Sequence, residues 1–129
     1  HFTLSQAIKS QTASRLGVDN MPPDSILDRM KAVCEFILEP VFAHFKKTVS
    51  INSFYRSEPV ERALNWYGDN EKSPFAKWCK KRCLPVNEST WAQYFANKQH
   101  PTGEAVDFEI PGIDNAVVAA WVRDNLDFD

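Results

Sequence analysis

Between residues 24 and 45 the apolar side chains recur every three or four positions, and no other feature constrains the fold of this chain as strongly. This is the spacing of one buried face of an α-helix. Asp24 is placed to cap the first turn, and Pro40 removes a backbone donor from a later one. We therefore expect a long helix that is kinked or split at Pro40. Its buried face comprises Ile26, Leu27, Met30, Val33, Cys34, Ile37, Leu38, Val41, Phe42 and Phe45.

Two short segments predict β-strands. Residues 48–53 alternate in a way that favours a strand, and residues 104–110 alternate again before Pro111-Gly112 ends the run. In the second strand alternate residues share a face, with Val106, Phe108 and Ile110 on one side and Ala105, Asp107 and Glu109 on the other. Strands combined with a long helix predict an α+β fold.

Shorter helices are expected at both ends of the chain. Residues 5–8 and 10–16 favour one or two of them, and Gly17 suits a helix C-terminus. Asp114 can cap a last helix that continues to about Asn125. Its inward-facing residues are expected to be Val117, Val118, Trp121 and Val122.

Residues 66–98 have a different character, being rich in aromatic side chains and poor in strand formers. Ser73 followed by proline predicts a capped helix start, and a second helix is expected at about 89–96. We interpret the segment as a helical insertion packed on the rest of the domain by Trp66, Phe75, Trp78, Trp91 and Phe95. It also carries a basic cluster formed by Lys77, Lys80, Lys81 and Arg82.

Composition limits the possible functions. A chain of 129 residues fits a single domain, and its net charge of −2 makes electrostatic binding to nucleic acid or to an anionic membrane a poor expectation. No apolar run approaches the length of a membrane span, and the first residues lack the pattern of a signal peptide. Cys79 and Cys83 have no second ligand pair nearby, so a zinc site there is a weak expectation.

A possible metal site lies later in the chain. His100 and Asp107 are seven residues apart across a turn that contains Gly103. Both are metal-ligand types, and a catalytic zinc usually takes three protein ligands and one water. A strand carboxylate next to core residues is costly unless it is paired or bound. The alternatives are a solvated strand face and a structural histidine. Arg56 follows the first strand, and it gains functional interest where its loop faces the same pocket as Asp107.

Taken together, these segments resemble the zinc D-Ala-D-Ala carboxypeptidases, peptidoglycan peptidases that share a fold with the hedgehog signalling domain. The resemblance is carried by Tyr55-Arg56-Ser57 after a strand and by a His-x-x-Gly-x-Ala-x-Asp motif from His100 to Asp107. Stretches at 2–5, 10–13, 15–17, 34–45 and 121–129 resemble a phage and bacterial branch of that family. The insertion at 66–98 has no counterpart in it.

The resemblance implies a fold and a set of roles. The fold would be a small antiparallel sheet with helices packed on it, in a single peptidase-like domain. His100 and Asp107 would bind zinc, which lowers the pKa of its bound water to about 7. Arg56 would polarise the scissile carbonyl and stabilise the oxyanion. Ser53 and Tyr55 would shape the substrate loop. The substrate would be a peptidoglycan stem peptide.

The chain also departs from the family pattern. Lys98 stands where the family often has serine, and Glu61 stands where it often has asparagine or glutamine, so the specificity is open. The family continues with a strand that carries a catalytic glutamate and then the third zinc ligand. We expect that the natural protein is longer than this chain. The two less favoured alternatives are a truncated form and a degenerate member of the family.

Two other functions stay open beside the peptidase. The first is a non-enzymatic cell-wall or virion binding module on the same fold. The second possibility is an active enzyme in which residues 66–98 form an added surface that binds a partner protein.

Overall fold

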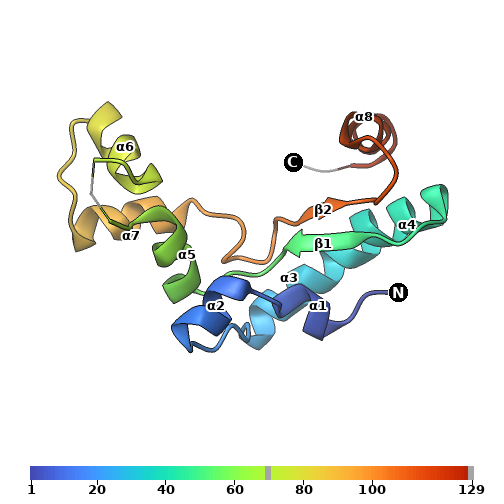
Figure 1. Cartoon of the computed structure of the whole chain (residues 1–129), viewed down its shortest axis with the longest axis horizontal. Helices are drawn as coiled ribbons and strands as arrows, with labels where there is room; N and C mark the ends of the chain where they lie inside the picture. Colours follow the sequence, from blue (N-terminus) through green and yellow to red (C-terminus); the bar gives the residue numbers. More distant parts are fainter. Residues whose placement is uncertain (69–70, 128–129) are drawn as a thin grey trace.

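The computed structural model describes residues 1–68 and 71–127. It has an α+β fold in which helices surround a small antiparallel sheet (Figure 1), and this coarse prediction is confirmed. The elements are α1 (Leu4–Ile8), α2 (Gln11–Leu16), α3 (Asp24–Val33), the π-helical η1 (Cys34–Leu38), α4 (Glu39–Phe45), β1 (Ser50–Ser53), α5 (Glu58–Asn65), α6 (Pro74–Lys81), α7 (Glu88–Ala96), β2 (Asp107–Glu109) and α8 (Asn115–Asn125).

The long helix of the sequence analysis forms as α3, η1 and α4 in direct succession. Pro40 cannot donate a backbone hydrogen bond, and the helix widens into a π-helical segment just before it. There the backbone N–H of Glu39 reaches the carbonyl of Cys34. The irregularity expected at Pro40 as a kink or a split is thus a π-helical turn over residues 34–38. The expected cap is wrong, because Pro23 is the N-cap residue and Asp24 is the first helical residue, where its carboxylate favours the helix dipole.

The sheet in the described residues consists of β1 and β2, and both strands are shorter than predicted. Ile51 pairs with Phe108 and Ser53 pairs with Asp107, with a register shift between Ile51 and Ser53. A bulge of this kind re-aims the side chains beside it. It leaves Ser53 directly across from Asp107, at the end of the sheet where the chain leaves β1.

One hydrophobic core lies between the long helix, the sheet and α8. Its buried residues include Met30, Leu38, Val41, Phe54, Ile110 and Val118. Cys34 packs against this core, and burial raises the pKa of its thiol. The inward face of α8 differs from the prediction at one position: Val117 is 55% exposed, whereas its neighbour Val118 is buried.

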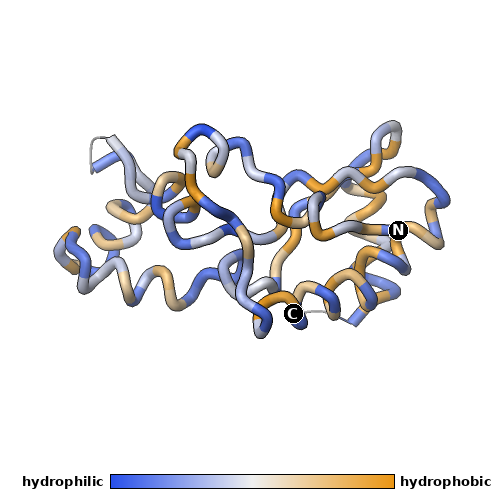
Figure 2. Tube along the Cα trace, turned by 90° about the horizontal axis from the view of Figure 1, so that it is seen from below, coloured by the Kyte–Doolittle hydropathy of each residue, from blue (hydrophilic) through white to orange (hydrophobic). Residues whose placement is uncertain are grey.

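A second core lies inside the helical insertion, at the other end of an elongated molecule (Figures 1 and 2). It is built on Phe75, Cys79, Trp91 and Tyr94. The helical character of the insertion and the cap at Ser73 agree with the prediction, since the Ser73 hydroxyl accepts a hydrogen bond from the backbone N–H of Ala76. The aromatic residues, however, pack mainly on one another, so the insertion is a small lobe with its own core.

The cysteines of this lobe face different environments. Cys79 is fully buried and burial raises the pKa of its thiol, whereas Cys83 is exposed at a residue with a φ of +54°. Both cysteines are free thiols. Among the described residues, neither belongs to a group of three or more side chains that could hold a metal ion. In the described part of the chain, no helix is both long enough and apolar enough to cross a membrane.

Candidate metal and active site

The fold brings Arg56, His100 and Asp107 together from three separate segments. Nε2 of His100 lies 3.3 Å from Oδ2 of Asp107, and Nη2 of Arg56 lies 3.5 Å from the same oxygen. Arg56 comes from the loop that connects β1 to α5, His100 from the turn before β2, and Asp107 from the first position of β2. The three residues singled out in the sequence therefore share one site.

The turn that carries His100 depends on Gly103. This glycine has a φ of +74°, and its backbone N–H donates to the carbonyl of His100. A Cβ at this position would lie 2.8 Å from a side-chain carbon of Met30 and 2.9 Å from the backbone oxygen of Ile26. The turn is thus pressed against α3, and only glycine fits both the backbone conformation and the space.

Replacing Gly103 with alanine is expected to destabilise the protein by about 2–4 kcal/mol, because a left-handed backbone and a backbone clash both oppose the new methyl group. Gly17→Ala is the matched control. Gly17 has a φ of +67° with open space around a Cβ, so the variant carries the conformational cost alone, about 1 kcal/mol. Chemical denaturation measures both, and equal losses for the two variants would contradict the close packing of the turn.

The imidazole of His100 is oriented by the backbone. Its Nδ1 lies 2.7 Å from the carbonyl oxygen of Phe54, and its side chain is 15% exposed. A carbonyl oxygen only accepts hydrogen bonds, so Nδ1 must carry the hydrogen. In the neutral ring, Nε2 then presents its lone pair to Asp107. This arrangement of a backbone carbonyl, a histidine and a metal position is common in metalloproteins.

The separation between the ligand atoms of His100 and Asp107 is compatible with a shared zinc ion, and it is equally compatible with a proton between them. A lone pair on Nε2 and a carboxylate oxygen repel each other at 3.3 Å unless a proton or a cation lies between them. Ligand atoms bound to one tetrahedral zinc at its usual bond lengths lie about 3.3 Å apart. The two side chains therefore fit two positions of such a site. Among residues 1–68 and 71–127, no third His, Cys, Asp or Glu joins them.

The guanidinium of Arg56 is directed by a different partner at each nitrogen. Nε donates to the hydroxyl of Ser53 at 2.8 Å, while Nη1 and Nη2 lie 3.5 Å from Glu61 and Asp107. A guanidinium has five N–H groups. Beyond these three contacts with described residues, one N–H remains on each terminal nitrogen. Those two groups are suited to binding a carbonyl or carboxylate oxygen.

A cavity of about 400 Å³ opens beside Arg56. Ser53 and Arg56 contribute to its wall together with Lys9, Ser10, Gln11, Thr12, Ile51, Asn52, Val60 and Leu64. Tyr55, by contrast, is buried, and burial together with the nearby Asp19 raises the pKa of its hydroxyl. Ser53 is thus a wall residue, and Tyr55 belongs to the packing beneath the loop.

Asn20 holds the loop that carries Tyr55 and Arg56, and no sequence pattern predicts this role. Its amide nitrogen donates to the carbonyl of Tyr55 at 3.1 Å, and its amide oxygen accepts from the backbone N–H of Ser57 at 2.8 Å. The same nitrogen also donates to the carbonyl of Ile8. A lone asparagine in a turn segment carries no sequence signal for such contacts.

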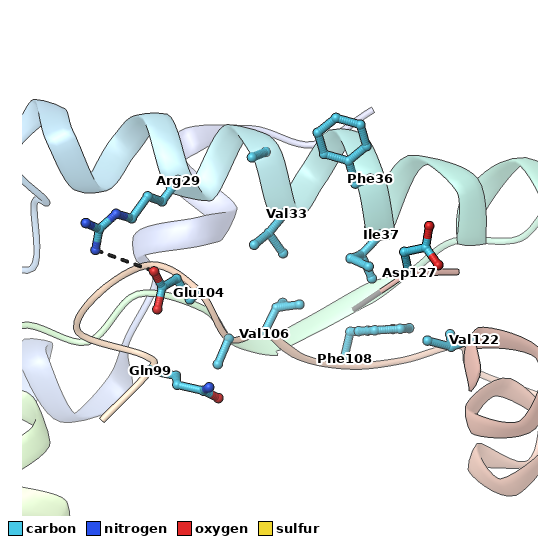
Figure 3. A pocket seen from close by; sticks show the side chains of 12 residues that line it. Arg29, Val33, Phe36, Ile37, Gln99, Glu104, Val106, Phe108, Val122 and Asp127 are labelled. Carbon is cyan, nitrogen blue, oxygen red and sulfur yellow. Dashed lines mark ion pairs between the residues drawn. The ribbon is translucent and has the colours of Figure 1, made fainter. Parts of the chain in front are cut away.

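A larger cavity of about 650 Å³ lies between the long helix and β2 (Figure 3). Its walls are largely apolar, with Val33 and Ile37 facing Val106 and Phe108, and an ion pair between Arg29 and Glu104 at one end. None of Arg56, His100 and Asp107 lines it. Arg56 lines the smaller cavity, whereas His100 and Asp107 line neither cavity and are linked to the smaller one through the contact of Asp107 with Arg56. We therefore place the candidate chemistry at the edge of the smaller cavity, beside Arg56.

Comparisons with protein-family models, with curated proteins and with solved structures found no match. Membership of the carboxypeptidase family accordingly stays a prediction that rests on the residues described above.

Proposed function

We propose that the protein is a zinc-dependent peptidase of the D,D-carboxypeptidase type, acting on peptidoglycan stem peptides through a hedgehog-like fold. One observation carries the proposal: Nε2 of His100 and Nη2 of Arg56 both lie within 3.5 Å of Oδ2 of Asp107, and Arg56 lines a cavity. Metal-ligand atoms beside an arginine with unused N–H groups are a combination that zinc-dependent hydrolysis of a peptide bond can use.

Each residue would have a distinct task. His100 and Asp107 would hold the zinc, which when bound supplies a hydroxide near neutral pH. The carbonyl of Phe54 keeps Nε2 of His100 turned toward the metal position. The two remaining N–H groups of Arg56 would bind the scissile carbonyl and stabilise the negative charge that develops on its oxygen. The 400 Å³ cavity would receive the peptide, with Lys9 as a cationic group for its terminal carboxylate.

The second candidate is a non-enzymatic binding module for cell-wall peptides on the same fold. It is favoured by the ligand set, because the described residues supply two metal ligands where a catalytic zinc usually has three. Such a module would bind the peptide through Arg56 and the cavity without cleaving it.

Incubation with a stem pentapeptide that ends in D-Ala-D-Ala separates the two candidates. If the protein is a peptidase, we expect it to release D-alanine in the presence of zinc and to lose this activity when a chelator is added. It should not cleave the same peptide ending in L-Ala-L-Ala. Binding without release at saturating zinc would favour the module. Release that continues unchanged in the presence of the chelator would rule out a zinc mechanism.

A further inference from the structure

A chain of buried hydrogen bonds connects the helical lobe to Arg56. The hydroxyl of Tyr94 on α7 donates to the side-chain oxygen of Asn65 at 2.7 Å. The amide nitrogen of Asn65 donates to Oε1 of Glu61 at 3.0 Å, and Oε2 of Glu61 lies 3.5 Å from Nη1 of Arg56. Glu61 is 2% exposed, and Asn65 and Tyr94 are also buried. The hydrogen-bond chain is therefore buried as far as Glu61, and it ends at Arg56, whose side chain is 23% exposed.

The donors and acceptors along this chain fix one orientation. Asn65 has to turn its oxygen to the Tyr94 hydroxyl and its nitrogen to Glu61, where it also donates to the backbone carbonyl. One oxygen of the Glu61 carboxylate is thereby committed to Asn65, and the other faces Arg56. A buried carboxylate is costly without a cationic partner, and Arg56 is that partner.

Further contacts tie α5 to α7, so the position of Glu61 depends on the lobe. Arg62 makes two hydrogen bonds of 2.7 Å to the carboxylate of Glu88, and the indole N–H of Trp91 donates to Glu58 at 3.3 Å. Tyr94 itself lies in the aromatic core of the lobe. A shift of α7 would thus move α5, and with it the carboxylate that faces Arg56.

We infer that the helical insertion at 66–98 is a positioning element for Arg56, acting through Tyr94, Asn65 and Glu61. This inference rests on the proposed function, in which the guanidinium must face the scissile carbonyl. Glu61 is 2% exposed, and its carboxylate is turned inward, where it orients the arginine. The geometry of a catalytic arginine matters because a displacement of about 1 Å can cost about 100-fold in rate.

Tyr94→Phe tests the inference, with Tyr67→Phe as the matched control, because Tyr67 is the exposed tyrosine of the same lobe. Tyr94→Phe is expected to lower kcat for D-alanine release about 5- to 10-fold, with KM and zinc affinity within twofold of the wild type. In nitrogen-15 spectra, the Nε–H signal of Arg56 is expected to shift and to exchange faster with water. Tyr67→Phe should change none of these quantities.

Glu61→Gln is the second variant, and it keeps the shape of the side chain while removing the charge that faces Arg56. It should shift the Arg56 signal further and lower kcat at least tenfold, again with KM within twofold. An Arg56 signal unchanged in both variants would overturn the inference, whether or not the protein releases D-alanine. If the wild type releases none, the proposed function fails, and the Arg56 signal still decides whether the lobe positions this side chain.

Discussion

Replacing His100 with alanine is expected to weaken zinc binding about 100-fold, which corresponds to about 2.8 kcal/mol. Loss of a residue that only supports a metal ligand typically costs 10- to 100-fold in affinity, so loss of a ligand itself should reach at least the upper end of that range. Asp107→Asn should have a similar effect, because it removes the charge from the second ligand and keeps its size. Competition titration with a chromophoric chelator measures both constants.

His44→Ala is the control for this experiment. The ring of His44 is exposed on α4 and stacks on Trp121 at 4.3 Å, and no described contact joins it to the site. The His44→Ala variant removes an imidazole that lies away from the site, so its zinc affinity should stay within twofold of the wild type. Equal zinc affinity in His100→Ala and the wild type would place any bound metal at other residues and remove the basis of the zinc peptidase.

The candidate site could be predicted where local sequence determines it. The seven-residue spacing of His100 and Asp107 around a glycine turn is a local feature, and so is an arginine just after a strand. The apolar spacing of the long helix and the cap at Ser73 are local in the same sense. By themselves these patterns are weak indications of a site, and the resemblance to the carboxypeptidases joins Arg56, His100 and Asp107 into one prediction. The fold places the three side chains in contact.

The supporting residues could not be predicted in this way. Glu61, Asn65 and Tyr94 meet only because side chains of α5 and α7 contact one another, and in the sequence a buried glutamate on a helix resembles an exposed one. The bulge that sets Ser53 across from Asp107 likewise depends on how two distant strands pair. Both arise from tertiary contacts that no periodicity encodes.

Arg56→Lys is expected to lower kcat for D-alanine release about 100- to 1,000-fold, the range seen when one group that stabilises an oxyanion is lost. Lysine keeps the charge, but it cannot direct N–H groups at Ser53, Glu61 and the substrate in one plane. Arg29→Lys is the matched control, since Arg29 forms an exposed ion pair with Glu104 at the other cavity. That variant should retain wild-type activity, and a comparable loss in both would mean that Arg56 has no special role in the reaction.

The same arginine should contribute to stability, and this can be separated from its part in the reaction. Arg56→Ala leaves the carboxylate of Glu61 buried without its cation, which is expected to cost about 1–3 kcal/mol; the value is below that of a fully buried pair because the arginine side chain is 23% exposed. Adding Glu61→Gln removes the unpaired charge, so the double variant should recover at least half of that loss in chemical denaturation while kcat stays low. Stability losses that simply add in the double variant would show that the two side chains are not energetically coupled.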